Sequence, residues 1–162
     1  TPIDEKSMIT TPLFYEEFFV FSHDKINKAY ILQEEIDFRH LWLLEEGHCM
    51  RHQMMKLCEL RNLENSNIKY NAGSIESLIN ITEASGGMTI IPELATWKLS
   101  PERKERVIPF FEPTPVREVS VIHHKFTTKQ RLISALSQII SNVIPSYMKI
   151  KETYQRIDIN PL

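Results

Sequence analysis

Apolar and polar residues alternate in short segments along most of the chain, and the first half predicts two strands and a helix. Residues 14–21 are rich in aromatic side chains and end at a Ser-His-Asp turn, which favours a buried strand. Residues 33–41 favour a short helical or turn segment, and residues 42–44 favour a brief buried strand. Apolar residues at helical spacing within residues 49–63 then predict a helix with Cys49 in its first turn.

The second half continues this alternation. Ser74 is a favourable N-cap for a helix that the pair Gly86-Gly87 ends. Further strands are predicted at residues 68–70, 88–91, 107–111 and 119–122, and further helices at residues 93–98 and 127–143. Because strands and helices alternate throughout, the order predicts an α/β unit with a mainly parallel sheet.

Two prolines mark a boundary late in the chain. Pro113 and Pro115 each fix their own φ and bias the preceding residue toward extended conformations, which predicts a stiff crossover. The strand and helix that follow need further strands to pack against, and none is predicted beyond residue 116 for them. The pattern therefore suggests that the chain begins partway through a larger domain.

Composition narrows the class of protein. The 162 residues are 42% hydrophobic and 25% charged, which is typical of a soluble globular protein of one or two small domains. The net charge of -2 leaves no basic face large enough to neutralise many phosphates, so this chain alone is not expected to bind nucleic acid. No apolar run is long enough for a membrane span and the first residues lack a signal-peptide layout, so we expect a cytoplasmic protein.

The two cysteines of the chain carry the candidate chemistry. Cys49 and Cys58 are nine positions apart, so a continuous helix places them on opposite faces and roughly 13 Å apart along its axis. A disulfide requires Cα atoms within about 4.4 to 6.8 Å. A bond between these cysteines therefore requires the segment between them to unwind, which makes the bond a conformational switch.

The surroundings of Cys49 favour reactivity. Gly47 allows a tight turn before it, and the first free N–H groups of the predicted helix favour a thiolate. His48 and Arg51 lie beside it in sequence. Cys58 follows Leu57 and is expected to be buried, as a resolving thiol that condenses with a sulfenic acid formed at Cys49.

Other interpretations of the same residues remain open at this point. Two cysteines in a helix are often simply small buried hydrophobic residues. The spacing of Cys49 and Cys58 alone favours this interpretation and a redox pair equally. His48, Cys49, His52 and Cys58 are also possible metal ligands, although zinc ligation would again require unwinding.

The sequence LLEEGHCMRHQMMKLC, residues 43–58, closely resembles the redox motif of the OxyR group, the peroxide-sensing LysR-type transcriptional regulators. The matching residues are Gly47, His48, Cys49, Arg51, Gln53 and Cys58. Residues 74–95 resemble the helix, glycine pair and strand of the effector domain of these regulators, and Pro115-Val116-Arg117 resembles their arginine-bearing crossover. The resemblance covers about residues 11–145.

This resemblance implies an α/β fold, the Rossmann-like effector domain of the periplasmic-binding-protein type, with two subdomains of which the first is incomplete in this chain. It also implies a division of the chain. We expect a crossover or linker at residues 1–11, regulatory subdomain II with the redox-active cysteines at residues 12–116, the returning strand and helix of subdomain I at residues 117–146, and a C-terminal tail at residues 147–162.

Residue roles follow from the resemblance by position. Cys49 is the thiol that hydrogen peroxide oxidises, and Cys58 is its disulfide partner. The expected thiolate- or peroxide-supporting residues are His48, Arg117, Gly47, Arg51 and Gln53. No metal and no cofactor are implied. The group commonly has an acidic residue where this chain has His52, which is a departure from its charge pattern.

The resemblance also implies partners. It predicts a transcription regulator that is not an enzyme, that forms a homodimer or tetramer through regulatory domains, and that contacts RNA polymerase. DNA would be bound by a helix-turn-helix domain absent from this chain. Reduction of the disulfide would come from a glutaredoxin- or thioredoxin-type protein.

A LysR-type effector domain that binds a small metabolite is the alternative function. Ser74, at a helix N-terminus, would help to hold an anion in the cleft between subdomains.

Overall fold

The longest strand, β1 (Met8–Ser22), organises the sheet. From Phe14 to Val20 its residues alternate between a buried and a partly exposed face, which is the period of two that a strand imposes. Its first part pairs antiparallel with β6 (Thr114–His124), and its last part with β4 (Met88–Pro92). The third partner, β5 (Val107–Pro109), also pairs with the last part of β1.

The computed structural model describes residues 6–45, 49–57, 71–149 and 154–157. Its remaining strands are β2 (Leu41–Leu44), β3 (Asn71–Ala72) and β7 (Tyr154–Arg156). The α-helices are α1 (Cys49–Leu57), α2 (Ile75–Ser85), α3 (Glu93–Thr96), α4 (Pro101–Lys104) and α5 (Gln130–Val143). Short 3-10 turns occupy Gln33–Glu35, Phe38–His40 and Ser146–Met148. No helix in these ranges is both long and apolar enough to cross a membrane.

The seven strands form a mixed sheet in the order β3-β2-β4-β1-β6-β7, with β5 pairing with β1 beside this path. The prediction of a mainly parallel sheet was wrong, because the central strand β1 runs antiparallel to all three of its partners. Parallel pairs occur between β2 and β3, β2 and β4, and β6 and β7. The alternating order of elements predicted the α/β class correctly, but it contains no information on the direction in which β1 and β6 meet.

Several local predictions are confirmed. The Ser74 hydroxyl accepts a hydrogen bond from the Ser77 amide at 3.1 Å, as an N-cap of α2 should. Gly86 and Gly87 end this helix with φ angles of 79° and 88°. A Cβ atom on Gly87 would lie 2.3 Å from the carbonyl oxygen of His40, so only glycine fits this close approach.

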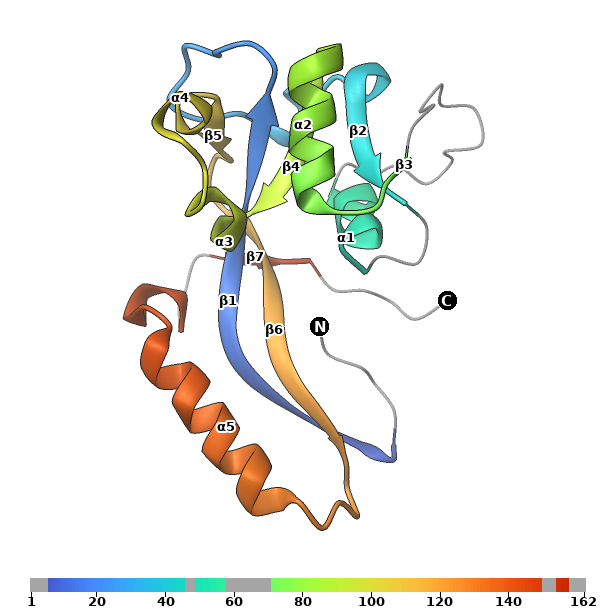
Figure 1. Ribbon diagram of the computed structural model, residues 1–162, viewed down its shortest axis with the longest axis vertical. Helices are drawn as coiled ribbons and strands as arrows, with labels where there is room; N and C mark the ends of the chain where they lie inside the picture. The colour runs from blue at the N-terminus through green and yellow to red at the C-terminus, as the bar shows by residue number, and fades with distance from the viewer. Residues whose placement is uncertain (1–5, 46–48, 58–70, 150–153, 158–162) are drawn as a thin grey trace.

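The main hydrophobic core lies between the sheet and helices α1 and α2, in the upper part of Figure 1. One face of α1 contributes Met50, Gln53, Met54 and Leu57, whose spacing of three and four residues places them on the same side of the helix. A smaller cluster of Phe21, Ile79 and Ile91 packs beside it.

The lower part of the molecule is built differently. Figure 1 shows β1 and β6 extending together away from the core, with α5 alongside. No residue of α5 is buried, although its sequence carries an apolar stripe. The large exposed side chains of this helix are Leu132, Leu136, Ile139 and Val143.

Three of the later elements, β6, α4 and β7, differ from the sequence predictions. The strand expected at residues 119–122 is part of the longer β6, which begins at Thr114 and includes Pro115. Helix α4 and strand β7 were not predicted. The strand predicted at residues 68–70 lies outside the described residues.

Candidate functional site

Cys49 is the first residue of α1, and it is an exposed free thiol. The helix that carries it follows β2 closely in the chain. Arg51, in the first turn, donates a hydrogen bond from Nη1 to the carbonyl oxygen of Leu44, the last residue of β2. The thiol is therefore accessible to a small oxidant, while the helix behind it is attached to the sheet.

Gln53 lies one helical turn after Cys49 and faces the core. It is 1% exposed, and its Nε2 donates a hydrogen bond of 3.1 Å to the carbonyl oxygen of Ile157. Within the described ranges, its Oε1 is buried without a hydrogen-bond partner. Buried polar atoms without a partner are uncommon in native proteins, so this glutamine is under a constraint that an apolar residue would not have.

The predicted arginine of the crossover, Arg117, pairs with a buried carboxylate of β1. Its Nε and Nη2 donate to Oε2 of Glu16 at 2.7 and 2.6 Å. The other oxygen, Oε1, accepts the backbone N–H of Leu94 at 2.8 Å, near the start of α3. Glu16 is 0% exposed, and its buried carboxylate is compensated by one guanidinium and one backbone amide.

A second buried carboxylate, Glu118, directly follows Arg117 in β6. Its Oε2 accepts a hydrogen bond from Nη1 of Arg156 at 2.8 Å and from the Tyr15 hydroxyl at 3.4 Å. Its Oε1 accepts the Ser120 hydroxyl at 2.6 Å. The crossover therefore contains two adjacent ion pairs whose carboxylates are both buried.

The structure thus describes only part of the predicted site. Cys58, Gly47 and His48 lie outside the described residues. Arg117 has its guanidinium on Glu16, and its predicted support of the Cys49 thiolate stays a prediction.

The LysR substrate-binding domain family matches residues 1–144. The chain belongs to this family. The predicted similarity of the chain to the OxyR group is confirmed by the solved structures that it matches. OxyR from Porphyromonas gingivalis has 30% sequence identity and a TM-score of 0.83, with 98% of this chain and 74% of that one covered.

Curated relatives agree with this membership in the LysR family. A hydrogen peroxide-inducible genes activator of Haemophilus influenzae is 22% identical over 148 residues, which cover 90% of this chain and 49% of that protein. The DNA-binding transcriptional dual regulator OxyR of Escherichia coli is 29% identical over 126 residues, covering 74% of this chain and 40% of that protein. The chain spans about half the length of the relatives it matches, or less.

Two features bear on other ligands that a LysR-family domain could take. Ser74, the candidate anion ligand, uses its hydroxyl to cap α2 and donates to Oγ of Ser77 at 2.9 Å. Among the described residues, no group of three or more His, Cys, Asp and Glu side chains could hold a metal ion. Because His48 and Cys58 lie outside these residues, the metal alternative is not tested by this finding.

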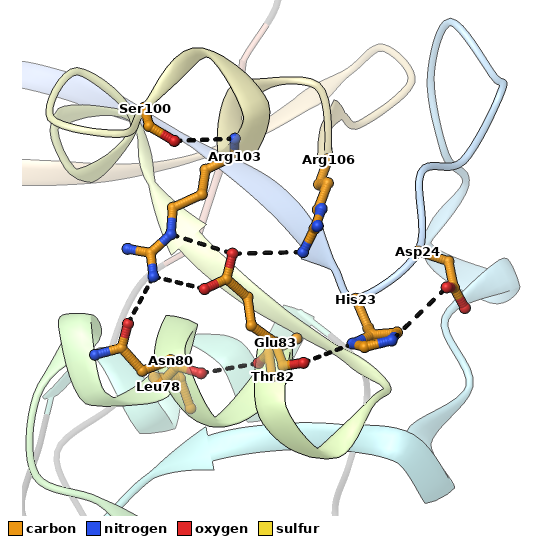
Figure 2. Close-up of polar contacts among 9 residues, drawn as sticks. All are labelled: His23, Asp24, Leu78, Asn80, Thr82, Glu83, Ser100, Arg103 and Arg106. Atoms are coloured by element: carbon orange, nitrogen blue, oxygen red, sulfur yellow. Dashed lines mark hydrogen bonds and ion pairs between the residues drawn. The ribbon is translucent and has the colours of Figure 1, made fainter.

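Figure 2 shows a second polar cluster, which joins α2 to α4 in this LysR-family fold. Glu83 of α2 accepts from Nε of Arg103 at 3.1 Å and from Arg106 at 3.4 Å, and Arg103 also donates to Asn80 at 2.8 Å. His23 Nδ1 contacts the carbonyl oxygen of Glu83 at 2.8 Å. The polar groups of this cluster have their hydrogen-bond partners within it. The cluster therefore holds the C-terminal end of α2 in place.

Sequence reasoning missed the two buried carboxylates. The signal for Glu16 was present, since an acidic pair interrupts the aromatic run of residues 14–21. On a strand that alternates, one residue of such a pair must share the face of its apolar neighbours. Glu118 carried no comparable signal, because its burial depends on Arg156, 38 positions away.

Proposed function

We propose that this chain is the redox-sensing regulatory domain of a LysR-type transcription regulator, in which hydrogen peroxide oxidises Cys49. The observation that carries the proposal is the exposed free thiol at the first residue of α1, within a motif that resembles the OxyR group. Peroxide is small and uncharged, and the oxidation of a cysteine by it requires an accessible sulfur as well as thiolate character. The names of the peroxide-responsive relatives support the same assignment.

The proposed chemistry has two steps. The Cys49 thiolate attacks one peroxide oxygen, an S–O bond forms as the O–O bond breaks, and the leaving hydroxide takes a proton to become water. The sulfur of Cys58 then attacks the resulting sulfenic acid, an S–S bond forms, and a second water leaves. Two thiols are oxidised to one disulfide while one peroxide is reduced to two waters.

Helix geometry supports a conformational change in the second step. Leu57 is eight residues beyond Cys49 in α1, which corresponds to about 12 Å along the axis. Consecutive Cα atoms are about 3.8 Å apart, whereas a disulfide joins Cα atoms within about 6.8 Å. A residue bonded to Leu57 therefore reaches Cys49 only if part of α1 unwinds.

The wider assembly is part of the proposal. We expect residues 12–116 to act as one subdomain and residues 117–146 as the returning part of another, joined by β1 and β6. The whole regulator would form a homo-oligomer, bind DNA through a separate helix-turn-helix domain and contact RNA polymerase. A glutaredoxin- or thioredoxin-type protein would reduce the disulfide.

Counting thiols before and after one equivalent of hydrogen peroxide tests the proposed function. We expect the loss of both thiols in the wild type. The Cys58→Ser variant should form a sulfenic acid at Cys49 that dimedone labels, and Cys49→Ser should not react. The two serine variants are matched controls, because each removes one sulfur and leaves the other.

Other outcomes assign other functions. If dimedone labels Cys58 in the Cys49→Ser variant, the roles of the two cysteines are reversed. If no thiol is lost, the metabolite-binding alternative is favoured. Protection of the thiols by one equivalent of zinc would favour a metal site.

A further inference from the structure

The segment of residues 154–157, called the β7 segment below, lies between the Cys49 helix and the crossover strand. In Figure 1 β7 crosses beside β1 and β6 at the middle of the molecule, below α1. It includes strand β7 and the buried residue Ile157. Each side of this segment makes specific contacts, and the two sets involve different elements.

On one side the β7 segment contacts α1. The carbonyl oxygen of Ile157 accepts the hydrogen bond from Gln53 Nε2, and the Ile157 side chain is part of the core that contains Met50, Met54 and Leu57. Gln53 is buried and its Oε1 lacks a partner among the described residues. Burying this glutamine costs free energy because Oε1 has no hydrogen-bond partner among the described residues. The hydrogen bond from Nε2 to Ile157 offsets part of that cost.

On the other side the segment contacts the crossover. β7 pairs in parallel with residues Thr114 to Val116 of β6, and the Ile157 amide donates to the Val116 carbonyl at 2.8 Å. Arg156 donates to the buried carboxylate of Glu118 at 2.8 Å. The β7 segment therefore contacts β6 on both sides of Arg117.

We propose that the β7 segment transmits the oxidation state of Cys49 to the crossover strand β6, and that Gln53 is the positioning residue that couples α1 to it. This inference rests on the proposed function for its trigger, the disulfide formed when peroxide is reduced to water. Unwinding α1 removes the backbone that holds Gln53 in position. The Ile157 carbonyl then loses its donor, the Ile157 side chain loses its core neighbours, and the pairing of β7 with β6 weakens.

Hydrogen exchange in the full chain tests the coupling without relying on oxidation alone. In the reduced protein we expect Gln53→Met to raise the exchange rate of the Ile157 amide about five-fold, which is the factor that corresponds to the loss of one ordinary buried hydrogen bond. Methionine keeps the length and helix preference of glutamine and removes only the polar end. Gln138→Met, on the exposed side of α5, is the matched control and should leave that rate unchanged.

Coupling must also act in the reverse direction. Ile157→Ala should raise the exchange of the Gln53 to Leu57 amides of α1 in the reduced protein, several-fold or more. Ile139→Ala, which truncates an exposed isoleucine of α5, should not. Urea midpoints of all four variants separate a local change from a global loss of stability.

Oxidation supplies the third arm. In the wild type, one equivalent of peroxide should raise exchange of the β7 segment at least ten-fold, and mass spectrometry of the same sample reports the disulfide. A disulfide that leaves the β7 segment protected would overturn the coupling while the proposed function stands. If no thiol reacts, the proposed function fails, and the two reduced-state arms still decide the coupling. If Gln53→Met and Ile157→Ala both match their controls, the inference is wrong.

Discussion

Helices α1 and α5 have opposite relations between sequence and burial. The sequence of α1 includes four polar or charged residues among nine and has the weaker apolar stripe, yet four of its nine residues are buried. The sequence of α5 carries the stronger apolar stripe, yet none of its residues is buried. Burial therefore depends on which surface is available opposite a helix. α1 packs on β2 and the main core, whereas α5 lies along the extension of β1 and β6.

The two helices differ in how many contacts depend on their backbone conformation. A change in the backbone of α1 disturbs the main core and the Gln53 contact with Ile157. A similar change in α5 would disturb few described contacts. Cys49 is thus on the helix that packs into the main core.

The largest expected effect comes from truncating one leucine in each helix. Leu57→Ala removes a side chain that is 2% exposed and should lower the free energy of unfolding by about 2 to 5 kcal/mol. Leu132→Ala removes one that is 66% exposed and should change it by no more than about 0.5 kcal/mol. Urea unfolding of the two variants measures both values, and equal losses would break the comparison.

The next effect extends the comparison to charges. Glu16→Gln leaves Arg117 without its anion in a buried region, so we expect a loss of about 2 kcal/mol in the free energy of unfolding. The arginine side chain is 21% exposed, which keeps the loss below that of a fully buried pair. Glu105→Gln, at the exposed pair with Lys25, is the control and should have no measurable effect. Matching denaturation curves for the two variants would mean that the crossover pair is not structural.

The smallest effect concerns an exposed carboxylate and depends on pH. Hydrogen bonds from Arg39, and then from His40, hold the pKa of Asp37 well below its usual value. A lowered pKa stabilises the folded state above the unfolded pKa, near 3.9, and this contribution is lost as the pH falls below that value toward the folded pKa. The stability difference between wild type and Asp37→Asn should therefore be small at pH 7 and shrink below about pH 4. A difference that grows in acid would contradict this assignment.

Much of the local structure followed from sequence. The N-cap at Ser74, the helix end at Gly86-Gly87 and the position of Cys49 at a helix start depend on nearby residues, and all three are confirmed. The direction of β1 relative to its neighbours depends on chain connections that periodicity does not encode.

The ion pairs of the crossover were beyond sequence reasoning for a related reason. Glu16 and Arg117 face each other because of the register between β1 and β6, across 101 positions of the chain. Gln53 was expected near the site from the motif, but its hydrogen bond to Ile157 spans 104 positions. Such contacts are set by the assembled sheet, and the β7 segment, which provides one of them, has too short a sequence pattern to predict.

Hydrogen exchange of α1 and α5 in one sample, before and after oxidation by one equivalent of peroxide, tests the central claim most directly. The amides of residues 53–57, whose acceptors lie four residues earlier in α1, should be protected in the reduced protein and lose that protection when the Cys49-Cys58 disulfide forms, because the helix between the sulfurs must unwind. The amides of residues 133–143 in α5 should change little and serve as the internal reference. Retention of α1 protection in protein that carries the disulfide would contradict the account, because the two cysteines would then bond without any change in the helix.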